Sequence, residues 1–126
     1  MDLKALQSIL REFADARDWQ PFHTPKNLAT ALMVEAAELA EIFQWMTPEQ
    51  SLAAHHDPVL HEQIADELAD VLLYLLQIAD KTGVDVQNAV NRKLVKNAEK
   101  HPPRRAKRPV VAALSPRAPT KKPAVR

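Results

Sequence analysis

Apolar side chains recur at three- and four-residue steps in four segments of the chain, the spacing of one face of an α-helix. The four segments run over residues 2–18, 26–45, 58–81 and 85–101. Pro25 precedes the second segment, Pro58 opens the third, and Gly83 supplies a stop signal after it. No segment alternates as a strand does, and one glycine with abundant Ala and Leu also favours helices. The sequence therefore predicts an all-α protein.

Two of the predicted helices are too apolar for a single small bundle to cover. Residues 26–45 and 58–81 carry apolar side chains around much of their circumference, and a helix of that kind has to be buried on most sides. We therefore expect a four-helix bundle that is completed by oligomerisation, as a homodimer or a homotetramer. The alternative is a monomer with an exposed apolar face.

Length and cysteine content narrow the class of protein. A chain of 126 residues makes one domain. The absence of cysteine excludes a disulfide framework and thiolate metal sites, and it fits a reducing, cytoplasmic setting. The sequence has neither a run of 18 apolar residues nor a charged N-terminal segment followed by an apolar one, so it predicts no membrane span and no signal peptide.

The charge is divided between a body and a tail. Residues 1–101 hold nine basic and sixteen acidic side chains, a net charge of −7. Residues 102–126 hold eight basic side chains, no acid and six of the ten prolines, a net charge of +8. We predict a folded domain over 1–102 and a disordered, basic, proline-rich tail over 103–126.

Carboxylates interrupt both apolar helices at matching spacings. Glu35 and Glu38 lie in "ALMVEAAELAEIFQW", and Glu67 and Asp70 lie in "IADELADVLLYLLQIAD". Residues three apart lie about 60° apart around a helix, so each pair shares a face, with Glu41 near the edge of the first face. Because a buried charge without a partner is costly, something has to stabilise these acids.

A hard divalent cation resolves the repulsion among four converging acids. Carboxylate oxygens are the ligands that Mg²⁺ or Mn²⁺ accepts, and such a site leaves positions open for substrate phosphates. A di-iron site is disfavoured because no Glu is followed three residues later by His. The histidines between the two helices, His55, His56 and His61, are expected to be solvated. The alternative interpretation of the acids is two solvated helix faces.

The sequence also resembles a known family in two stretches, "RDWQPFHTPKNLATALMVEAAELAEIFQW" and "DELADVLLYLLQIAD". It is similar there to the MazG-like all-α nucleoside triphosphate pyrophosphohydrolases, and within them to the dCTP pyrophosphatase branch. The similarity covers roughly residues 3–102, and its specificity comes from "DW", "FHTP", "NLA", "FQW" and "DVLLYL" in that order beside the acidic motifs. "KHPP" departs from the family, where an aromatic residue often precedes the proline, which puts a strict preference for dCTP in doubt.

The resemblance implies Mg²⁺-dependent hydrolysis of a nucleoside triphosphate, dCTP or a modified dCTP, to the monophosphate and pyrophosphate. This is a house-cleaning reaction of the nucleotide pool. Intertwined dimers, often paired into tetramers, are implied as well. The four acids would hold the metal, with Glu38 as the base that orients the attacking water. The residues implied to contact the nucleotide are Trp19, His23 and Trp45 at the base, and Tyr74, Lys93 and Asn97 at the sugar or phosphates.

Helix geometry agrees with part of this assignment. Tyr74 follows Asp70 by one turn and Trp45 follows Glu38 by two turns, each on nearly the same side of its helix. The alternative for Trp19 and Trp45 is ordinary core packing.

Two other hypotheses stay open at this point. One is a non-catalytic helical interaction module whose basic tail binds nucleic acid, although the acidic body opposes nucleic acid as the main partner. The other is a hydrolase of the same fold that acts on a different nucleotide.

Overall fold

A computed structural model of the chain describes residues 1–104. It divides into two compact units, residues 1–84 and the residues from Asp85 onward, and each is described by itself. The first unit contains the helices α1 (Leu3–Ala16), α2 (Pro25–Phe43), α3 (Pro48–Leu52) and α4 (Pro58–Thr82), with 3-10 turns at Gln20–Phe22 and Ala54–His56. The second unit contains α5 (Val86–Lys100). No strand occurs within residues 1–104, and the predicted all-α class is confirmed.

Side-chain caps explain where the helices begin. The side chains of Asp2, Thr24 and Asp85 accept hydrogen bonds from backbone N–H groups three residues later, at 3.0, 3.1 and 3.0 Å. Asp57 caps α4 in the same way. These bonds satisfy donors that have no partner inside the first helical turn.

Local chemistry also explains where two helices end. Gly83 has a φ of +72°, a left-handed conformation that costs glycine little, and it closes α4. Helix α2 ends at Phe43, so Trp45 lies beyond it and not inside it. The next segment forms the short helix α3, because Thr47 and Gln50 build a reciprocal capping box.

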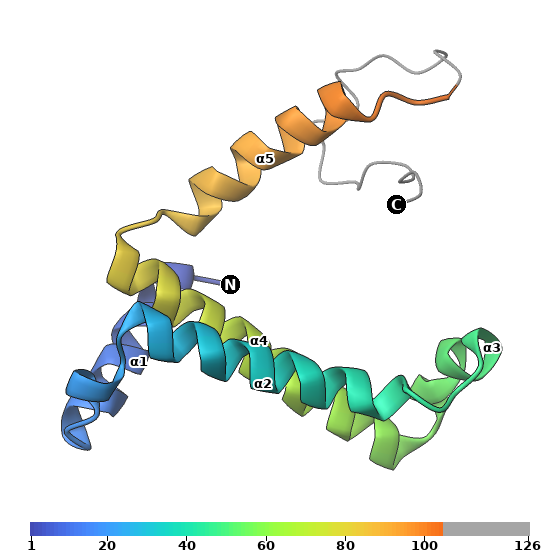
Figure 1. Ribbon diagram of the computed structural model, residues 1–126, viewed down its shortest axis with the longest axis horizontal. Coiled ribbons are helices and arrows are strands. Elements are labelled where there is room, and N and C mark those ends of the chain that lie inside the picture. The colour runs from blue at the N-terminus through green and yellow to red at the C-terminus, as the bar shows by residue number, and fades with distance from the viewer. Residues whose placement is uncertain (105–126) are drawn as a thin grey trace. The chain divides into compact units, whose positions relative to one another are not determined.

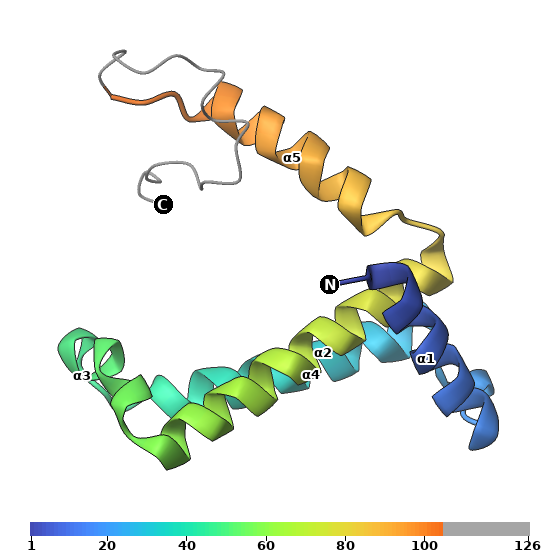
Figure 2. The ribbon, with the colours of Figure 1, turned by 180° about the vertical axis from the view of Figure 1, so that it is seen from behind.

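An antiparallel hairpin of α2 and α4 dominates the first unit. The two helices lie side by side along their lengths, joined through α3 (Figures 1 and 2). Helix α1 packs against the C-terminal part of α4. There, Gln7 Nε2 donates a hydrogen bond to the Leu76 carbonyl oxygen at 3.0 Å, and Arg11 forms a 2.6 Å ion pair with Asp80. The hairpin thus brings residues of two distant sequence segments onto facing surfaces.

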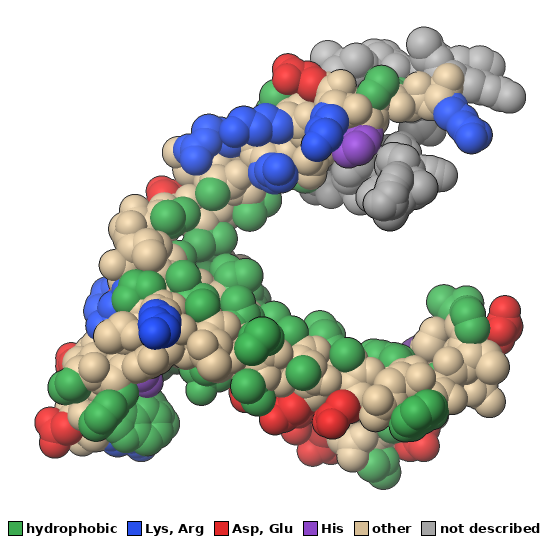
Figure 3. Space-filling view, viewed as in Figure 1, with side chains coloured by type: hydrophobic (Ala, Val, Ile, Leu, Met, Phe, Trp, Pro, Cys, Tyr) green, Lys and Arg blue, Asp and Glu red, His purple; other side chains and the backbone are tan. Residues whose placement is uncertain are grey.

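The first unit buries few side chains. Only Leu28 and Leu76 are large and fully buried among the described residues. Several large apolar side chains are open to solvent instead, including Phe22 at 66% and Met33 at 65% exposed. Figure 3 shows hydrophobic side chains on the surface of the α2–α4 hairpin, beside acidic ones. An apolar surface this extensive marks an interaction site more often than a free face.

Two further predictions concern membrane-spanning helices and the C-terminal tail. Among the described residues, no helix is both long and apolar enough to cross a membrane. The predicted tail, apart from Pro103 and Arg104, lies outside the described residues.

Candidate functional site

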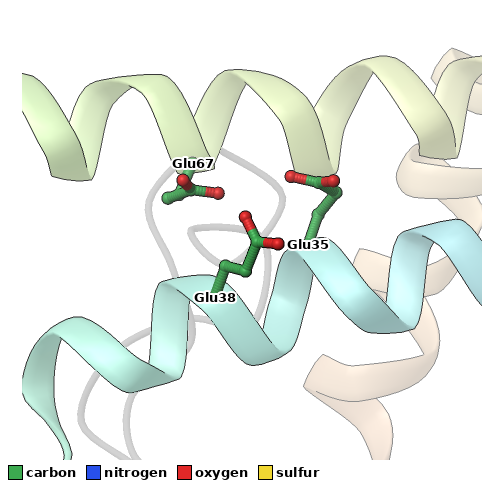
Figure 4. A group of neighbouring side chains, drawn as sticks. All are labelled: Glu35, Glu38 and Glu67. Atoms are coloured by element: carbon green, nitrogen blue, oxygen red, sulfur yellow. The ribbon is translucent and has the colours of Figure 1, made fainter.

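Three of the predicted acids meet between the helices of the hairpin. Glu35 and Glu38 of α2 face Glu67 of α4 (Figure 4). Each side chain offers one carboxylate oxygen, and these three oxygens lie within 4.8 Å of one another. The i, i+3 spacing on α2 puts its two carboxylates on one face, and the antiparallel packing brings α4 against that face.

One oxygen of this group has no partner. Glu67 Oε2 is enclosed by protein and makes no hydrogen bond within residues 1–104. A buried carboxylate oxygen without a donor is costly. Among the described residues, no hydrogen-bond donor stabilises the negative charge at Glu67 Oε2.

Burial and mutual repulsion shift the acidity of this group. Burial raises the pKa of Glu35 above its ordinary value of 4.5, and the charges of Glu38, Asp70 and Glu67 raise it further. The pKa of Glu67 is raised by burial first and then by Glu38 and Asp70. Each raised pKa means that burial and the neighbouring carboxylates disfavour the ionised form of the glutamate.

Asp70 and Glu41 differ in their relation to the three clustered acids. Asp70 lies one turn beyond Glu67 on α4 and is half-buried. It is not one of the three clustered acids, yet its charge acts on two of them. Glu41 is exposed and stands apart from the cluster, as its place at the edge of the helix face predicted.

The donor set fits a hard divalent cation. Three carboxylate oxygens in mutual reach, a fourth acid nearby and an unpartnered Glu67 Oε2 are what Mg²⁺ or Mn²⁺ accepts. Thiolate ligands are absent because the chain has no cysteine. A bound cation would offset the burial and the mutual repulsion that raise the pKa values of Glu35 and Glu67.

Trp19 and His23 lie together in the loop before α2. The Trp19 ring packs edge-on against Phe13, with ring centres 5.8 Å apart, and lies 6.0 Å from the His23 ring. Trp19 remains 43% exposed. The loop therefore presents an open aromatic surface at the N-terminal end of α2, and Trp19 is not a core residue of this unit.

Trp45 lies beyond the opposite end of the same helix. It is 88% exposed, so it is not packed in the core of the described protomer. Helix α2 has 19 residues, which span about 28 Å at roughly 1.5 Å per residue. The acids lie between the two ends. One base cannot contact both His23 and Trp45 of a single chain.

The remaining predicted residues divide between the units. Tyr74 is half-buried on α4, one turn beyond Asp70 and on the same stripe. Lys93 and Asn97 lie one turn apart on α5, so they belong to the second unit and not to the acid group of the first.

Comparison with known proteins decides the family. A model of the MazG-like family matches residues 30–108, a range that includes all four acids. The chain belongs to the MazG-like family. The resemblance seen in the sequence is thereby confirmed.

The relatives of this MazG-like chain include named proteins and a crystal structure. It is 39% identical over 100 residues to dCTP pyrophosphatase 1 of Homo sapiens and 38% identical to that of Rattus norvegicus. The matched region is 79% of this chain and 59% of either relative, so the chain spans about three fifths of their length. It also resembles the crystal structure of a pyrophosphatase from Archaeoglobus fulgidus, with a TM-score of 0.73 and 42% identity over 79% of this chain and 92% of that one.

The MazG-like chain has a small pocket that the sequence did not predict. It lies between α1, the loop before α2 and the C-terminal end of α4. Its polar lining consists of Gln7, Arg11, Gln20, His23, Gln77, Asp80 and Lys81. His23 is the one residue of this set that had been singled out.

The acid group should make the metal-free protein less stable as the pH rises. Since the folded pKa values of Glu35 and Glu67 exceed 4.5, the folded chain holds protons that the unfolded chain has released. The free energy of unfolding then falls from about pH 4.5 up to the raised pKa values and levels off above them. Thermal melts in a chelator measure this slope.

The matched control for these melts is the double variant Glu35→Gln, Glu67→Gln. It should lack the slope, because its amides do not titrate. A wild-type melting temperature that rises relative to this control through the same pH window would contradict the account.

Proposed function

We propose that this protein hydrolyses a nucleoside triphosphate between the α- and β-phosphates, giving the nucleoside monophosphate and pyrophosphate. The observation that carries the proposal is the acid cluster with its unpartnered Glu67 Oε2. Membership of the MazG-like family supports it, as do relatives that are named pyrophosphatases. In the reaction, the oxygen of water bonds to the α-phosphorus and the bond from that phosphorus to the bridging oxygen breaks.

Glu35, Glu38, Glu67 and Asp70 are proposed to hold Mg²⁺, with Mn²⁺ as a substitute. Bound there, the ion would neutralise phosphate charge and acidify water. Glu38 is the exposed member of the clustered acids, so it is the one that solvent and substrate reach. We assign it the role of orienting the attacking water and accepting its proton.

The proposed substrate contacts extend from the acids in the direction of Tyr74. Tyr74 follows Asp70 by one turn on α4, and we assign it to the sugar of the nucleotide. Lys93 and Asn97 supply a cation and an amide one turn apart, a pairing suited to phosphate oxygens. We propose dCTP or a modified dCTP as the substrate, in a cytoplasmic house-cleaning role. The name dCTP pyrophosphatase 1 of two relatives supports dCTP.

The test is pyrophosphate release across a panel of dNTPs and NTPs. The full chain is assayed with Mg²⁺, with Mn²⁺ and with a chelator. We expect release that requires the metal and favours dCTP or a close analogue. Turnover in the chelator, or release of inorganic phosphate in place of pyrophosphate, would contradict the proposal.

A second copy of the chain is proposed to complete the site. The first unit leaves large apolar side chains exposed. The residues proposed to bind the base lie at opposite ends of α2, with Trp19 and His23 before it and Trp45 beyond it. In this arrangement, Trp45 of one copy would contact the base that His23 and Trp19 of the other copy bind. Packing of two hairpins against each other would bury the exposed apolar side chains and bring Trp45 of one copy near His23 of the other.

Light scattering should therefore find the full chain as a dimer or a tetramer. The apolar area that is exposed in one chain is the driving force, since its burial is worth roughly 25 cal/mol per Å². Because apolar contacts resist salt, assembly should persist at high ionic strength. A monomer at micromolar concentration that still hydrolyses nucleotides would contradict the composite site.

The catalytic domain is proposed to comprise residues 1–102, with the tail outside it. A stop codon after Pro103 removes residues 104–126, which carry eight basic side chains and no acid. We expect kcat and the melting temperature of the truncated protein to match those of the full chain. A loss of most activity would place tail residues in the site.

A further inference from the structure

Helix α5 carries a row of basic side chains along one side. Arg92, Lys96 and Lys100 follow one another at steps of four residues. Each step turns by only about 40° around a helix of roughly 3.6 residues per turn, so the three cations share one face. All three are exposed, and so is Arg104 just beyond the helix. Figure 3 shows Lys and Arg side chains gathered along α5. We call Arg92, Lys96 and Lys100 the basic face of α5.

No acid in the described part of the second unit neutralises this face. Residues 85–104 contain two acids, Asp85 and Glu99. The Asp85 carboxylate caps α5 and accepts a hydrogen bond from the Asn88 backbone N–H at 3.0 Å. Glu99 is exposed, and within residues 1–104 neither acid forms an ion pair. Because like charges one turn apart on a helix repel each other, the basic face does not contribute to the stability of α5.

Charge of the same sign continues along the sequence after α5. Residues 85–126 hold twelve basic and two acidic side chains, a net charge of +10. Residues 1–84 hold five basic and fourteen acidic side chains, a net charge of −9. The positive charge of the chain is therefore concentrated in its last third, and a segment with this balance attracts a polyanion.

The residue types favour the phosphates of a nucleic acid duplex over other anionic partners. Lys and Arg bind phosphate oxygens through charge-assisted hydrogen bonds. A duplex carries one phosphate per about 1.7 Å of its axis, so a row of cations about 12 Å long, at roughly 1.5 Å per helical residue, meets several phosphates. Residues 85–126 contain no Trp, Tyr or Phe. They therefore lack the rings that stack on unpaired bases and the aromatic anchors typical of helices that lie on membranes.

We propose that α5 and the basic segment after it bind the phosphate backbone of a nucleic acid duplex without reading its sequence. The basic face supplies its contacts from a helix, and the Lys and Arg residues from Arg104 onward add positive charge. This binding is separate from the proposed hydrolysis, because Arg92, Lys96 and Lys100 are not among the residues assigned to the metal or the nucleotide. Binding of this kind weakens steeply as salt is added, since each phosphate contact releases a bound counterion.

The experiment measures binding of the full chain to a short, fluorescently labelled DNA duplex. Fluorescence anisotropy gives Kd over a series of salt concentrations. The test variant is the double substitution Lys96→Gln, Lys100→Gln. The matched control is Lys4→Gln, Lys26→Gln, which also removes two exposed lysines but takes them from the first unit, so the two variants have the same net charge. Circular dichroism establishes that each variant folds.

We expect wild type to bind two duplexes of unrelated sequence with the same affinity. Each lost phosphate contact lowers the slope of log K against log salt by about 0.9 in magnitude. The Lys96, Lys100 variant should therefore lose about one to two from this slope, and its Kd should rise about five- to fiftyfold at about 0.1 M salt. The Lys4, Lys26 control should match wild type in both. An unchanged slope in the folded test variant, or an equal loss in the control, overturns the inference.

Other anionic partners are compared with the duplex under the same conditions. The competitors are the single strand of the same sequence, poly-glutamate, and vesicles of phosphatidylserine and phosphatidylcholine. We expect the duplex to bind most tightly. Tighter binding of the vesicles or of poly-glutamate would make the partner a membrane or an acidic protein and would overturn the inference. Tighter binding of the single strand would overturn the assignment to a duplex.

Discussion

Replacing Glu38 or Asp70 by alanine should abolish turnover while leaving the helical circular-dichroism signal intact. A metal at the transition state is worth several kcal/mol of charge stabilisation, so its loss lowers kcat/KM by more than about a hundredfold. The fold should survive, because these acids repel one another in the metal-free protein. Removing one of them should keep or raise the metal-free melting temperature.

Glu41→Ala is the matched control for these two variants. It removes the same charge from the same helix as Glu38→Ala, but Glu41 is exposed and outside the clustered acids. We expect near wild-type kcat/KM in Glu41→Ala. Full activity in Glu38→Ala, measured as pyrophosphate release, would remove the acid cluster from the mechanism.

Trp45→Ala should raise KM by about ten- to a hundredfold with a smaller effect on kcat. A stacked base contributes roughly 1–3 kcal/mol, in the ground state and the transition state alike. Stability should change little, since Trp45 is 88% exposed in the protomer. A sharp fall in melting temperature with KM unchanged would make Trp45 an interface or core residue without a role in base binding.

A mixture of Trp45→Ala and Glu38→Ala chains tests where Trp45 acts. In a mixed dimer, the Trp45→Ala chain supplies intact acids and the Glu38→Ala chain supplies an intact Trp45. If copies exchange at random in a two-fold dimer, about a quarter of wild-type activity at low substrate concentration should return. No recovery in a mixture whose mixed dimers are verified by mass spectrometry would show that Trp45 serves its own chain.

Periodicity was sufficient to predict the helices but not their ends. The four long helices lie where apolar spacing and the stop at Gly83 predicted them. Helix α2 ends at Phe43, because Thr47 and Gln50 cap a new helix just beyond it. Helix capping depends on single residues. The spacing of apolar residues is judged over several helical turns, so it does not locate a cap.

The acid site was predictable because its geometry is local. Two residues three apart share a helix face whatever the tertiary structure, so Glu35 and Glu38 had to point together. That Glu67 joins them, while Asp70 acts from one turn away, depends on how α2 and α4 are aligned. The spacing of the acids along the sequence does not predict how the two helices are aligned.

The pocket was missed because it forms between segments far apart in the sequence. Gln77 and Lys81 continue the stripe of Asp70 and Tyr74, which was a usable signal. Gln7 and Arg11 gave none, since their role depends on α1 packing against α4. The ion pair of Arg11 with Asp80 joins residues 69 apart in the chain.

The position of the new bond to oxygen tests the central claim most directly. Hydrolysis of dCTP by the full chain is run with Mg²⁺ in water labelled with heavy oxygen, and the products are separated and weighed by mass spectrometry. The account predicts that the label enters the nucleoside monophosphate and is absent from pyrophosphate, because water attacks the α-phosphorus. Label in pyrophosphate, or nucleoside diphosphate and labelled phosphate as the products, would contradict it.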